Sequence, residues 1–273
     1  MKLAQSLLFI TAATLLSGCI VVASPSYANY HSQQELVIDA ENLAKLDVEA
    51  GAGSLVISGS DKATTITVVA DIYTEKGNSD NYQFALTDSG ESAFLVAKIN
   101  SSRGFWQGES PHIDIKVTMP SRLMLKVDDG SGSASISDID GAVEIKDGSG
   151  DLTIKGIKNN LEINDGSGGL YVSEVIGNVR IVDGSGEMEI SEIDGNVDID
   201  DGSGSIYAKG ISGNARFEDG SGDLKVRNVD GEITIDDGSG DIDVERAGGL
   251  KIIESGSGGL RVKQVEGGFE IDE

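Results

Sequence analysis

The sequence predicts an all-β protein, a single-stranded parallel β-helix (β-solenoid) with 18-residue coils and two short strands per coil. Three observations predict it: a tetrapeptide recurs at one fixed spacing, apolar and polar residues alternate between its copies, and glycine recurs at the corners of each unit. The chain has 273 residues, of which 37 are glycine and three are proline. Many glycines with few prolines are typical of regular turns rather than of a disordered segment.

The tetrapeptide Asp-Gly-Ser-Gly recurs through the second half of the chain. Successive copies start every 18 residues, and the last copy has Ser255 in place of aspartate. The aspartates that begin the other copies are Asp129, Asp147, Asp165, Asp183, Asp201, Asp219 and Asp237. Self-similarity at a fixed period is typical of proteins that stack one structural unit on the next. Residues 129–273 are therefore predicted to form the regular part of the solenoid.

Between two copies of the tetrapeptide, apolar residues form two alternating pairs, for example Leu152 with Ile154 and Leu161 with Ile163. Alternation with a period of two predicts strands with one buried face. Two such short strands cannot bury that face alone, so the units are expected to stack at about 4.8 Å per coil. Eight coils then form a rod section on the order of 40 Å long.

Glycines at the corners of each unit are expected to adopt a positive φ or to leave no room for a Cβ atom. Asn159 replaces one of them, and asparagine tolerates a positive φ better than most residues. One irregularity tests the stacking model. Leu250 and Ile252 come one residue early, and the longer turn 254–258 returns the next strand to register, as a stacked strand requires.

Residues 35–128 repeat the pattern less regularly. Strands are predicted at 65–72, 84–86, 94–99, 113–119 and 123–127, from alternating or β-branched apolar residues. We interpret this region as longer, irregular coils that continue the repeats. A separate small β domain is the alternative.

Residues 1–18 are typical of a signal peptide, because Lys2 precedes an apolar stretch too short to span a bilayer. The stretch ends in Leu16-Ser17-Gly18-Cys19, which resembles the lipobox of bacterial lipoproteins. The resemblance implies cleavage before Cys19 and attachment of lipid to it, which makes a membrane the first partner. Ile20 at the next position implies sorting to the outer membrane, with its periplasmic and surface faces both left open.

The segment 19–34 lacks a sustained period and is predicted to be a tether between lipid and fold, with His31 solvated within it. Cys19 is the only cysteine of the chain, so no intrachain disulfide is possible.

The charge of the chain limits the partners that it can bind. The formal net charge is −25, and no basic stripe interrupts the acidic surface. Nucleic acid is therefore excluded, since phosphate binding needs clustered lysine and arginine. Water, cations and basic partners suit such a surface.

Two N-terminal segments and the coils that follow them carry a family resemblance. The segments are 48–53 (VEAGAG) and 117–121 (VTMPS). Together with the later Gly-x-Ile/Val-x-Ile coils they resemble the bacterial "putative adhesin" β-strand-repeat family of unknown function, over most of residues 36–273. The resemblance implies a β-helix and a location in the cell envelope. It implies no catalytic residues.

The row of tetrapeptide aspartates is the first candidate site. Each aspartate either accepts backbone N–H groups within its own turn or joins the next one in a row of Ca²⁺ sites. A standard calcium β-roll is disfavoured, because its ligand aspartate is replaced by apolar residues such as Leu152. A serine nucleophile in the Gly-Ser-Gly turns is also disfavoured, because the chain has only two histidines to serve as a base for the repeated serines.

The loop around Arg103, Phe105 and Trp106 is the second candidate site, for a partner. It contains the only tryptophan of the chain, and these residue types are enriched in binding hot spots. The alternative is that the two aromatic side chains fold back over the open N-terminal end of the core. His112, at the end of this loop, is expected to serve the turn.

These observations predict a non-enzymatic outer-membrane lipoprotein that acts as an adhesin-like binding or structural module of the envelope. Its partner would be an envelope glycan or protein. A carbohydrate-active enzyme on a β-helix is one alternative. A cation-binding or self-assembling scaffold, with end-to-end self-association, is the other.

Overall fold

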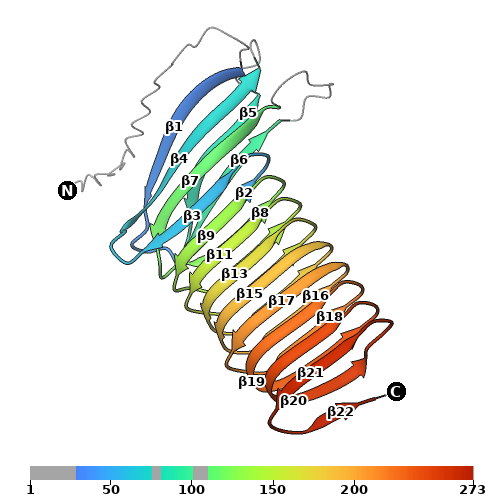
Figure 1. Cartoon of the computed structure of the whole chain (residues 1–273). Helices are drawn as coiled ribbons and strands as arrows, with labels where there is room; N and C mark the ends of the chain where they lie inside the picture. The colour runs from blue at the N-terminus through green and yellow to red at the C-terminus, as the bar shows by residue number, and fades with distance from the viewer. Residues whose placement is uncertain (1–28, 76–80, 101–109, 273) are drawn as a thin grey trace, which may run out of the picture.

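The computed structural model describes residues 29–75, 81–100 and 110–272. These residues form strands and turns, and none of them belongs to a helix long and apolar enough to cross a membrane. The coils stack into one rod, with β1 at one end and β22 at the other (Figure 1). The predicted all-β solenoid of 18-residue coils is confirmed over about residues 125–271.

The strands of the regular part are listed here in chain order. They are β8 (Met124–Asp129), β9 (Ala134–Ile139), β10 (Val143–Asp147), β11 (Leu152–Ile157), β12 (Leu161–Asp165), β13 (Leu170–Ile176), β14 (Val179–Asp183), β15 (Gly186–Asp194), β16 (Val197–Asp201), β17 (Gly204–Ile211), β18 (Ala215–Asp219), β19 (Leu224–Asp237), β20 (Ile242–Glu254), β21 (Leu260–Val265) and β22 (Phe269–Ile271).

Successive coils pair in parallel, one repeat apart. Ile145 of β10 lies opposite Ile163 of β12, which lies opposite Ile181 of β14. On the other side of the coil, Ile154 of β11 lies opposite Val172 of β13. Each apolar residue therefore contacts its own counterparts above and below, so the repeat period alone specifies both the strand pairing and the packing of the core.

The compensated irregularity near the far end is confirmed. Ile233 and Ile235 of β19 pair with Leu250 and Ile252 of β20, one residue out of step with the coils before them. The register shifts back directly after Ile235. Leu250 and Ile252 therefore stay fully buried, at 1% and 0% exposure.

The strands of the N-terminal part are β1 (Asn29–Asp39), β2 (Lys45–Ala50), β3 (Leu55–Ser60), β4 (Thr65–Glu75), β5 (Tyr82–Ser89), β6 (Ser92–Ile99) and β7 (His112–Pro120). The predicted strands of this region are present, but they do not stack in chain order. β2 and β3 form a coil that pairs in parallel with β8 and β9 on one side and with β6 and β7 on the other.

Three strands of this part run antiparallel to their neighbours and close the N-terminal end of the rod. β4 pairs with both β1 and β7, and β5 pairs with β6. The Gln34 side-chain amide donates to the Tyr82 hydroxyl at 2.6 Å, which links β1 to β5. Leu36 of β1 and Phe84 of β5 pack against the core. The interpretation of residues 35–128 as irregular solenoid coils is therefore incomplete, because an antiparallel cap belongs to the same sheet.

The cap also includes part of the segment predicted to be a tether. β1 begins at Asn29 and pairs with β4 along its whole length, so residues 29–34 are strand rather than linker. The path from β7 to β8 is held by Arg122, whose guanidinium donates to the carbonyl oxygens of Ala40 and Leu43 at 2.5 and 2.6 Å. This contact connects the first loop of the cap to the start of the regular coils.

The two corner glycines differ in what they require. Gly204, the second glycine of its tetrapeptide, has φ of +148°, and a Cβ there would lie 1.7 Å from the Gly186 carbonyl oxygen. Gly195, at the other corner, lacks such a φ, but a Cβ would lie 2.1 Å from the Gly177 carbonyl oxygen. Asn159 is not among the residues with positive φ, so the inference of a positive φ at its corner was wrong. Close stacking of backbones explains glycine at that corner.

Candidate functional site

The tetrapeptide aspartates form a ladder inside the rod. Val143, Ile145 and Asp147 alternate along β10 with the intervening residues, so all three side chains face the interior. Each aspartate lies opposite the next one in register, from Asp129 to Asp237. Their exposed fractions range from 0% to 4%. We call this row, Asp129, Asp147, Asp165, Asp183, Asp201, Asp219 and Asp237, the aspartate ladder.

One oxygen of most ladder carboxylates accepts a backbone N–H of its own turn. Asp219 Oδ1 accepts from Ser221 N at 2.9 Å, and the corresponding bonds of Asp183, Asp201 and Asp237 measure between 3.1 and 3.2 Å. Asp129 instead accepts from Gly130 N at 2.9 Å. The turn role proposed for these aspartates from the sequence is therefore present.

The other carboxylate oxygen of each ladder residue is buried without a hydrogen-bond partner among the described residues. In Asp147 and Asp165 both oxygens lack one. A buried charge without a partner is costly, so the neutral acid is favoured. Burial accordingly raises the pKa of Asp129, Asp147, Asp201 and Asp219 from 3.8 to about 6.

The pKa values of the remaining ladder carboxyls are also raised, and for the same reason. Burial raises the pKa of Asp165, Asp183 and Asp237, and the negative charge of an acidic neighbour adds to it. Among the described residues, no group of three or more His, Cys, Asp or Glu side chains could hold a metal ion. Ca²⁺ binding by the ladder stays a prediction.

The other strand of each coil contains a bend, and the residues at this bend form a second row along the rod. Asp138, Glu174 and Glu192 have φ values of 60°, 58° and 57°, a left-handed conformation that few non-glycine residues adopt. Glycine, asparagine, arginine and glutamine occupy the same place in the other coils, at Gly156, Gly210, Asn228, Arg246 and Gln264. This bend, which the sequence analysis missed, directs the side chains of the row outward.

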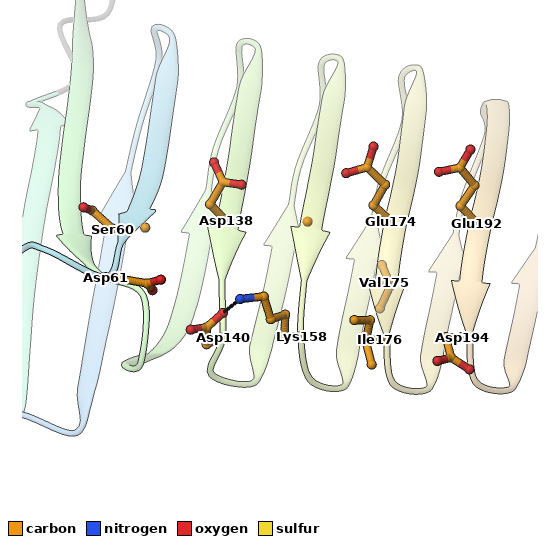
Figure 2. Close-up of a pocket in the computed structure, with 12 residues that line it drawn as sticks. Ser60, Asp61, Asp138, Asp140, Lys158, Glu174, Val175, Ile176, Glu192 and Asp194 are labelled. Atoms are coloured by element: carbon orange, nitrogen blue, oxygen red, sulfur yellow. Dashed lines mark ion pairs between the residues drawn. The ribbon is translucent and has the colours of Figure 1, made fainter.

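An acidic groove of about 590 Å³ follows this bend along the rod (Figure 2). Its charged lining residues are Asp61, Asp138, Asp140, Lys158, Glu174, Glu192 and Asp194. Lys155, beside the groove, pairs with Glu174 at 2.9 Å. Lys158 is the one cation of the lining itself, and its ammonium lies 2.9 Å from Asp140. This hydrogen bond holds the pKa of Asp140 below its usual range. Ile176, 56% exposed, adds an apolar side chain to the lining.

The same bend continues towards the far end with a different charge. A second groove of about 610 Å³ is lined there by Asp230, Arg246 and Glu266 with uncharged neighbours. Two carboxylates and one cation line it, against six carboxylates and one cation in the first groove, so the stronger negative charge lies in the half of the rod nearer the cap. We expect the acidic groove to attract a basic surface, by complementarity of charge.

The two histidines lie together in the cap, although the sequence analysis treated them separately. The ring of Tyr73 stacks between His31 and His112, with centroids 4.6 and 4.5 Å apart. His31 Nε2 lies 3.0 Å from Asp71 Oδ1, and His112 Nδ1 lies 2.9 Å from the Ser110 carbonyl oxygen. His112 thus contacts its turn as expected, whereas His31 is part of a strand. No periodic signal marks these contacts in the sequence.

The remaining predicted site residues are outside the described part of the chain. Cys19 precedes residue 29, and Arg103, Phe105 and Trp106 lie between residues 100 and 110. Their roles in lipid attachment and partner binding stay predictions.

Comparison with known proteins gives a likeness of fold. No family model matches the sequence, and no curated protein matches it. Solved structures to which it is similar include a "putative cell adhesion protein" of Clostridium sporogenes, at 14% identity and a TM-score of 0.35, over 86% of this chain and 99% of that one.

Two further similar structures come from other bacteria. A "putative lipid binding protein" of Parabacteroides distasonis has 19% identity and a TM-score of 0.49, over 88% of this chain and 97% of that one. A "putative adhesin" of Bacteroides fragilis has 15% identity and a TM-score of 0.36, with the same coverage of both chains. The structural similarity to bacterial putative adhesins that the sequence suggested is therefore found. It concerns the fold alone.

Proposed function

We propose that this chain is a non-enzymatic outer-membrane lipoprotein whose solenoid is an adhesin-like binding module of the cell envelope. The observation that carries the proposal is that the two ends of the rod differ. The cap that begins with β1 lies at one end, and the last coil, with β22, lies at the other.

A lipid on Cys19 would hold the capped end near the membrane. Residues 20–28 separate this cysteine from Asn29, the first residue of β1. Nine residues reach on the order of 30 Å when extended, so the cap stays close to the lipid surface. The continuous core stiffens the coils beyond the cap, and they project away from that surface.

The acidic groove is the binding surface we assign to a basic partner. Asp138, Glu174 and Glu192 face it from three different coils, spaced along the rod axis (Figure 2). A partner that spans several coils would contact all three at once. A protein of the envelope with clustered lysine or arginine side chains has the chemistry for this contact.

A carbohydrate-active enzyme would need a carboxylic acid with a raised pKa beside a second carboxylate in an open groove. In the acidic groove, Asp140 has a lowered pKa because it accepts from Lys158. The carboxyls with raised pKa values are those of the aspartate ladder, and at 0–4% exposure they are out of reach of a polysaccharide. These contacts support the binding module over the enzyme. Release of reducing ends from envelope polysaccharide by the purified chain would reverse this preference.

The anchor is tested with Cys19→Ser. We expect the wild-type chain to incorporate labelled palmitate and to sediment with outer membranes on a density gradient. The variant should lose the label and appear in the soluble fraction. Equal membrane association of both forms would contradict lipid anchoring at this residue.

The groove is tested with the triple variant Asp138→Lys/Glu174→Lys/Glu192→Lys. Calorimetric titration with an oligolysine peptide is expected to show binding to the wild-type chain and at least a tenfold loss in the variant. The control is Glu187→Lys/Glu189→Lys/Asp200→Lys, which makes the same change of charge at exposed positions outside the groove. An equal loss in both variants would show that net charge, and not the groove, binds the peptide.

A further inference from the structure

The last coil leaves core side chains uncovered. Leu260, Phe269 and Ile271 are exposed to 40%, 52% and 44%. One coil earlier, their register partners Ile242, Leu250 and Ile252 are at most 1% exposed. β21 and β22 pair with β20 alone, so each has a free backbone edge in the part of the chain that the structure describes. We call this surface the open end.

The opposite end of the rod cannot receive the open end in the same way. There, β1 and β5 close over the core, and they are joined by the Gln34–Tyr82 hydrogen bond. Head-to-tail stacking of copies would require a parallel coil with its core uncovered at both ends. Among the described residues the cap presents no parallel coil with an uncovered core, so we take the open end of a second copy as the surface that matches the open end.

The two strands of the open end carry opposite charges. Arg261 and Lys263 alternate with the core residues of β21, whereas Glu270 and Asp272 occupy the alternate positions in and directly after β22. Lys251 lies 3.6 Å from Glu270 and 3.0 Å from Asp272, so one cation is shared by two carboxylates. Arg261 and Lys263 likewise lie in register beside Asp243 and Glu245 of β20, two carboxylates that Arg227 also pairs with. In the outermost row itself, β21 carries two cations, and β22 with Asp272 carries two carboxylates.

Two kinds of two-fold axis could join a pair of open ends with antiparallel strands. One places β21 against β21 and β22 against β22 of the second copy, which brings like charges together. The other places β21 against β22 of the second copy, which brings Arg261 and Lys263 beside Glu270 and Asp272. The apolar faces meet in both arrangements. Charge complementarity therefore selects the second, because opposite charges across a strand pair stabilise it and like charges do not.

We propose that the open end binds the open end of a second copy of this chain, about a two-fold axis that pairs β21 with β22 of the other copy. Each copy covers the exposed Leu260, Phe269 and Ile271 of the other, and the free strand edges become paired. The contact is one coil wide and therefore smaller than a standard interface, so we expect a dimer in equilibrium with monomer at micromolar concentrations.

The arrangement has a consequence that rests on the proposed function. The two capped ends, and with them the two lipid anchors, lie at opposite ends of the dimer. Two copies anchored in facing membranes can therefore meet through their open ends. The module would then bind a second copy through its open end, in addition to the basic partner assigned to the acidic groove.

Sedimentation velocity tests the dimer with the full chain carrying Cys19→Ser, so that no lipid is attached. The wild-type surface is expected to shift from monomer to dimer between about 1 and 300 µM. Added salt should weaken the dimer, because it screens opposite charges. A monomer at all concentrations would overturn the proposal, and a dimer strengthened by salt would overturn the chosen axis.

Charge reversal tests which strands meet. Arg261→Glu/Lys263→Glu should raise the dimer dissociation constant at least tenfold, because both strands of the open end become acidic. Adding Glu270→Lys/Asp272→Lys to the same chain restores opposite charges and should restore the dimer. The control Lys146→Glu/Lys209→Glu makes the first change of charge in the middle of the rod and should leave the dimer intact. Failure of the fourfold variant to recover would contradict the pairing of β21 with β22.

The apolar contact has its own variant, Phe269→Ser, which should weaken the dimer at least tenfold and leave the circular dichroism of the monomer unchanged. An unaffected dimer would place the contact elsewhere. Lipid vesicles that carry the lipidated wild-type chain should cluster, and those with Arg261→Glu/Lys263→Glu should not. A soluble dimer without vesicle clustering would leave the open-end contact standing and contradict its role in joining facing membranes, whereas loss of membrane attachment in both forms would contradict the proposed anchor.

Discussion

The two turns of the middle coils carry ladders of short polar side chains that differ in burial and in hydrogen bonding. The aspartate ladder is buried, and its hydrogen bonds stay within a turn, as from Ser221 N to Asp219 Oδ1. The ladder of Asn160, Asn178, Asn196 and Asn214 is exposed, and its bonds join coils: Asn214 N donates to Asn196 Oδ1 at 2.9 Å. Asn196 also donates its side-chain amide to Asn178 Oδ1, at 3.1 Å.

The difference shows what stacking demands of a polar side chain. An amide has both a donor and an acceptor, so identical amides can bond to one another when stacked. An ionised carboxylate has acceptors only, so stacked carboxylates repel and leave an oxygen unpaired. Protonation would supply the missing donor. The aspartate side of each coil is therefore expected to respond to pH, and the asparagine side is not.

The largest effect is expected from breaking the turn of the aspartate ladder. Gly204→Ala places a Cβ 1.7 Å from the Gly186 carbonyl oxygen, at a φ of +148°. We expect the free energy of unfolding to fall by more than about 3 kcal/mol, since both the backbone and the adjoining coil must shift. Urea denaturation measures it.

The matched control for this change is Gly210→Ala. Its φ is +71°, and the nearest atoms to a Cβ there, in Glu192, are 3.7 Å away. Glu192 and Asn228 occupy this place in the neighbouring coils, so a cost below about 1 kcal/mol is expected. Equal costs at the two glycines would refute the assignment of close stacking to the aspartate turn.

The next effect is the dependence of stability on pH. The ladder carboxyls have raised pKa values in the folded chain, four of them about 6 against an ordinary 3.8. The folded state therefore holds protons that the unfolded state has released. These protons stabilise the folded state in full below about pH 4, and this stabilisation is lost as the pH rises through about 6. It is on the order of 2 kcal/mol in unfolding free energy for each carboxyl that titrates independently.

Asparagine substitution separates this effect from the general acidity of the chain. Asp165→Asn/Asp183→Asn/Asp201→Asn should flatten the rise in unfolding free energy on acidification from about pH 7 to pH 5. It should also stabilise the chain at neutral pH, because the amide keeps the acceptor and adds a donor. Glu162→Gln/Glu187→Gln/Glu189→Gln removes the same charge from exposed positions and should keep the slope. If the control variant flattened it as much, the ladder would not be the source.

The coils could be predicted from the sequence because local pattern and long-range contact coincide in a repeat. Ile145, Ile163 and Ile181 are neighbours in space because they are one period apart. The burial of the aspartates had a signal too, since Asp147 follows Val143 and Ile145 at the inward spacing. It was interpreted as turn chemistry because Asp-Gly-Ser-Gly is also the sequence of an exposed turn.

The cap could not be predicted, because its pairings join segments without a shared period. Nothing in residues 29–39 indicates that they pair antiparallel with 65–75. Nothing in β2 and β3 indicates that they enter the stack between β6–β7 and β8–β9. The left-handed bend at Glu174 was missed for another reason: glutamate rarely adopts that conformation, and only its coil neighbours impose it.

A smaller effect is expected on the asparagine side. Asn196→Ala removes the acceptor of the Asn214 backbone N–H and the donor to Asn178. Both bonds are exposed, and water can replace them, so a loss of about 1 kcal/mol in unfolding free energy is expected, without dependence on pH. Asn164→Ala, an exposed position on β12, is the control and should cost less. A cost above that of Gly204→Ala would mean that the two turns differ less than their burial suggests.

The smallest effect is expected from calcium. Thermal unfolding of the wild-type chain in low-millimolar Ca²⁺ or in chelator should give midpoints within about one degree, since a ligand stabilises only the state that binds it. The ladder is buried at 0–4% exposure, and the described residues contain no group of three or more candidate ligands. A rise of several degrees that is lost in Asp183→Asn would instead show cations between successive carboxylates. Ca²⁺ would then replace the proton as the partner of the unpaired oxygens, and the pH dependence should disappear in its presence.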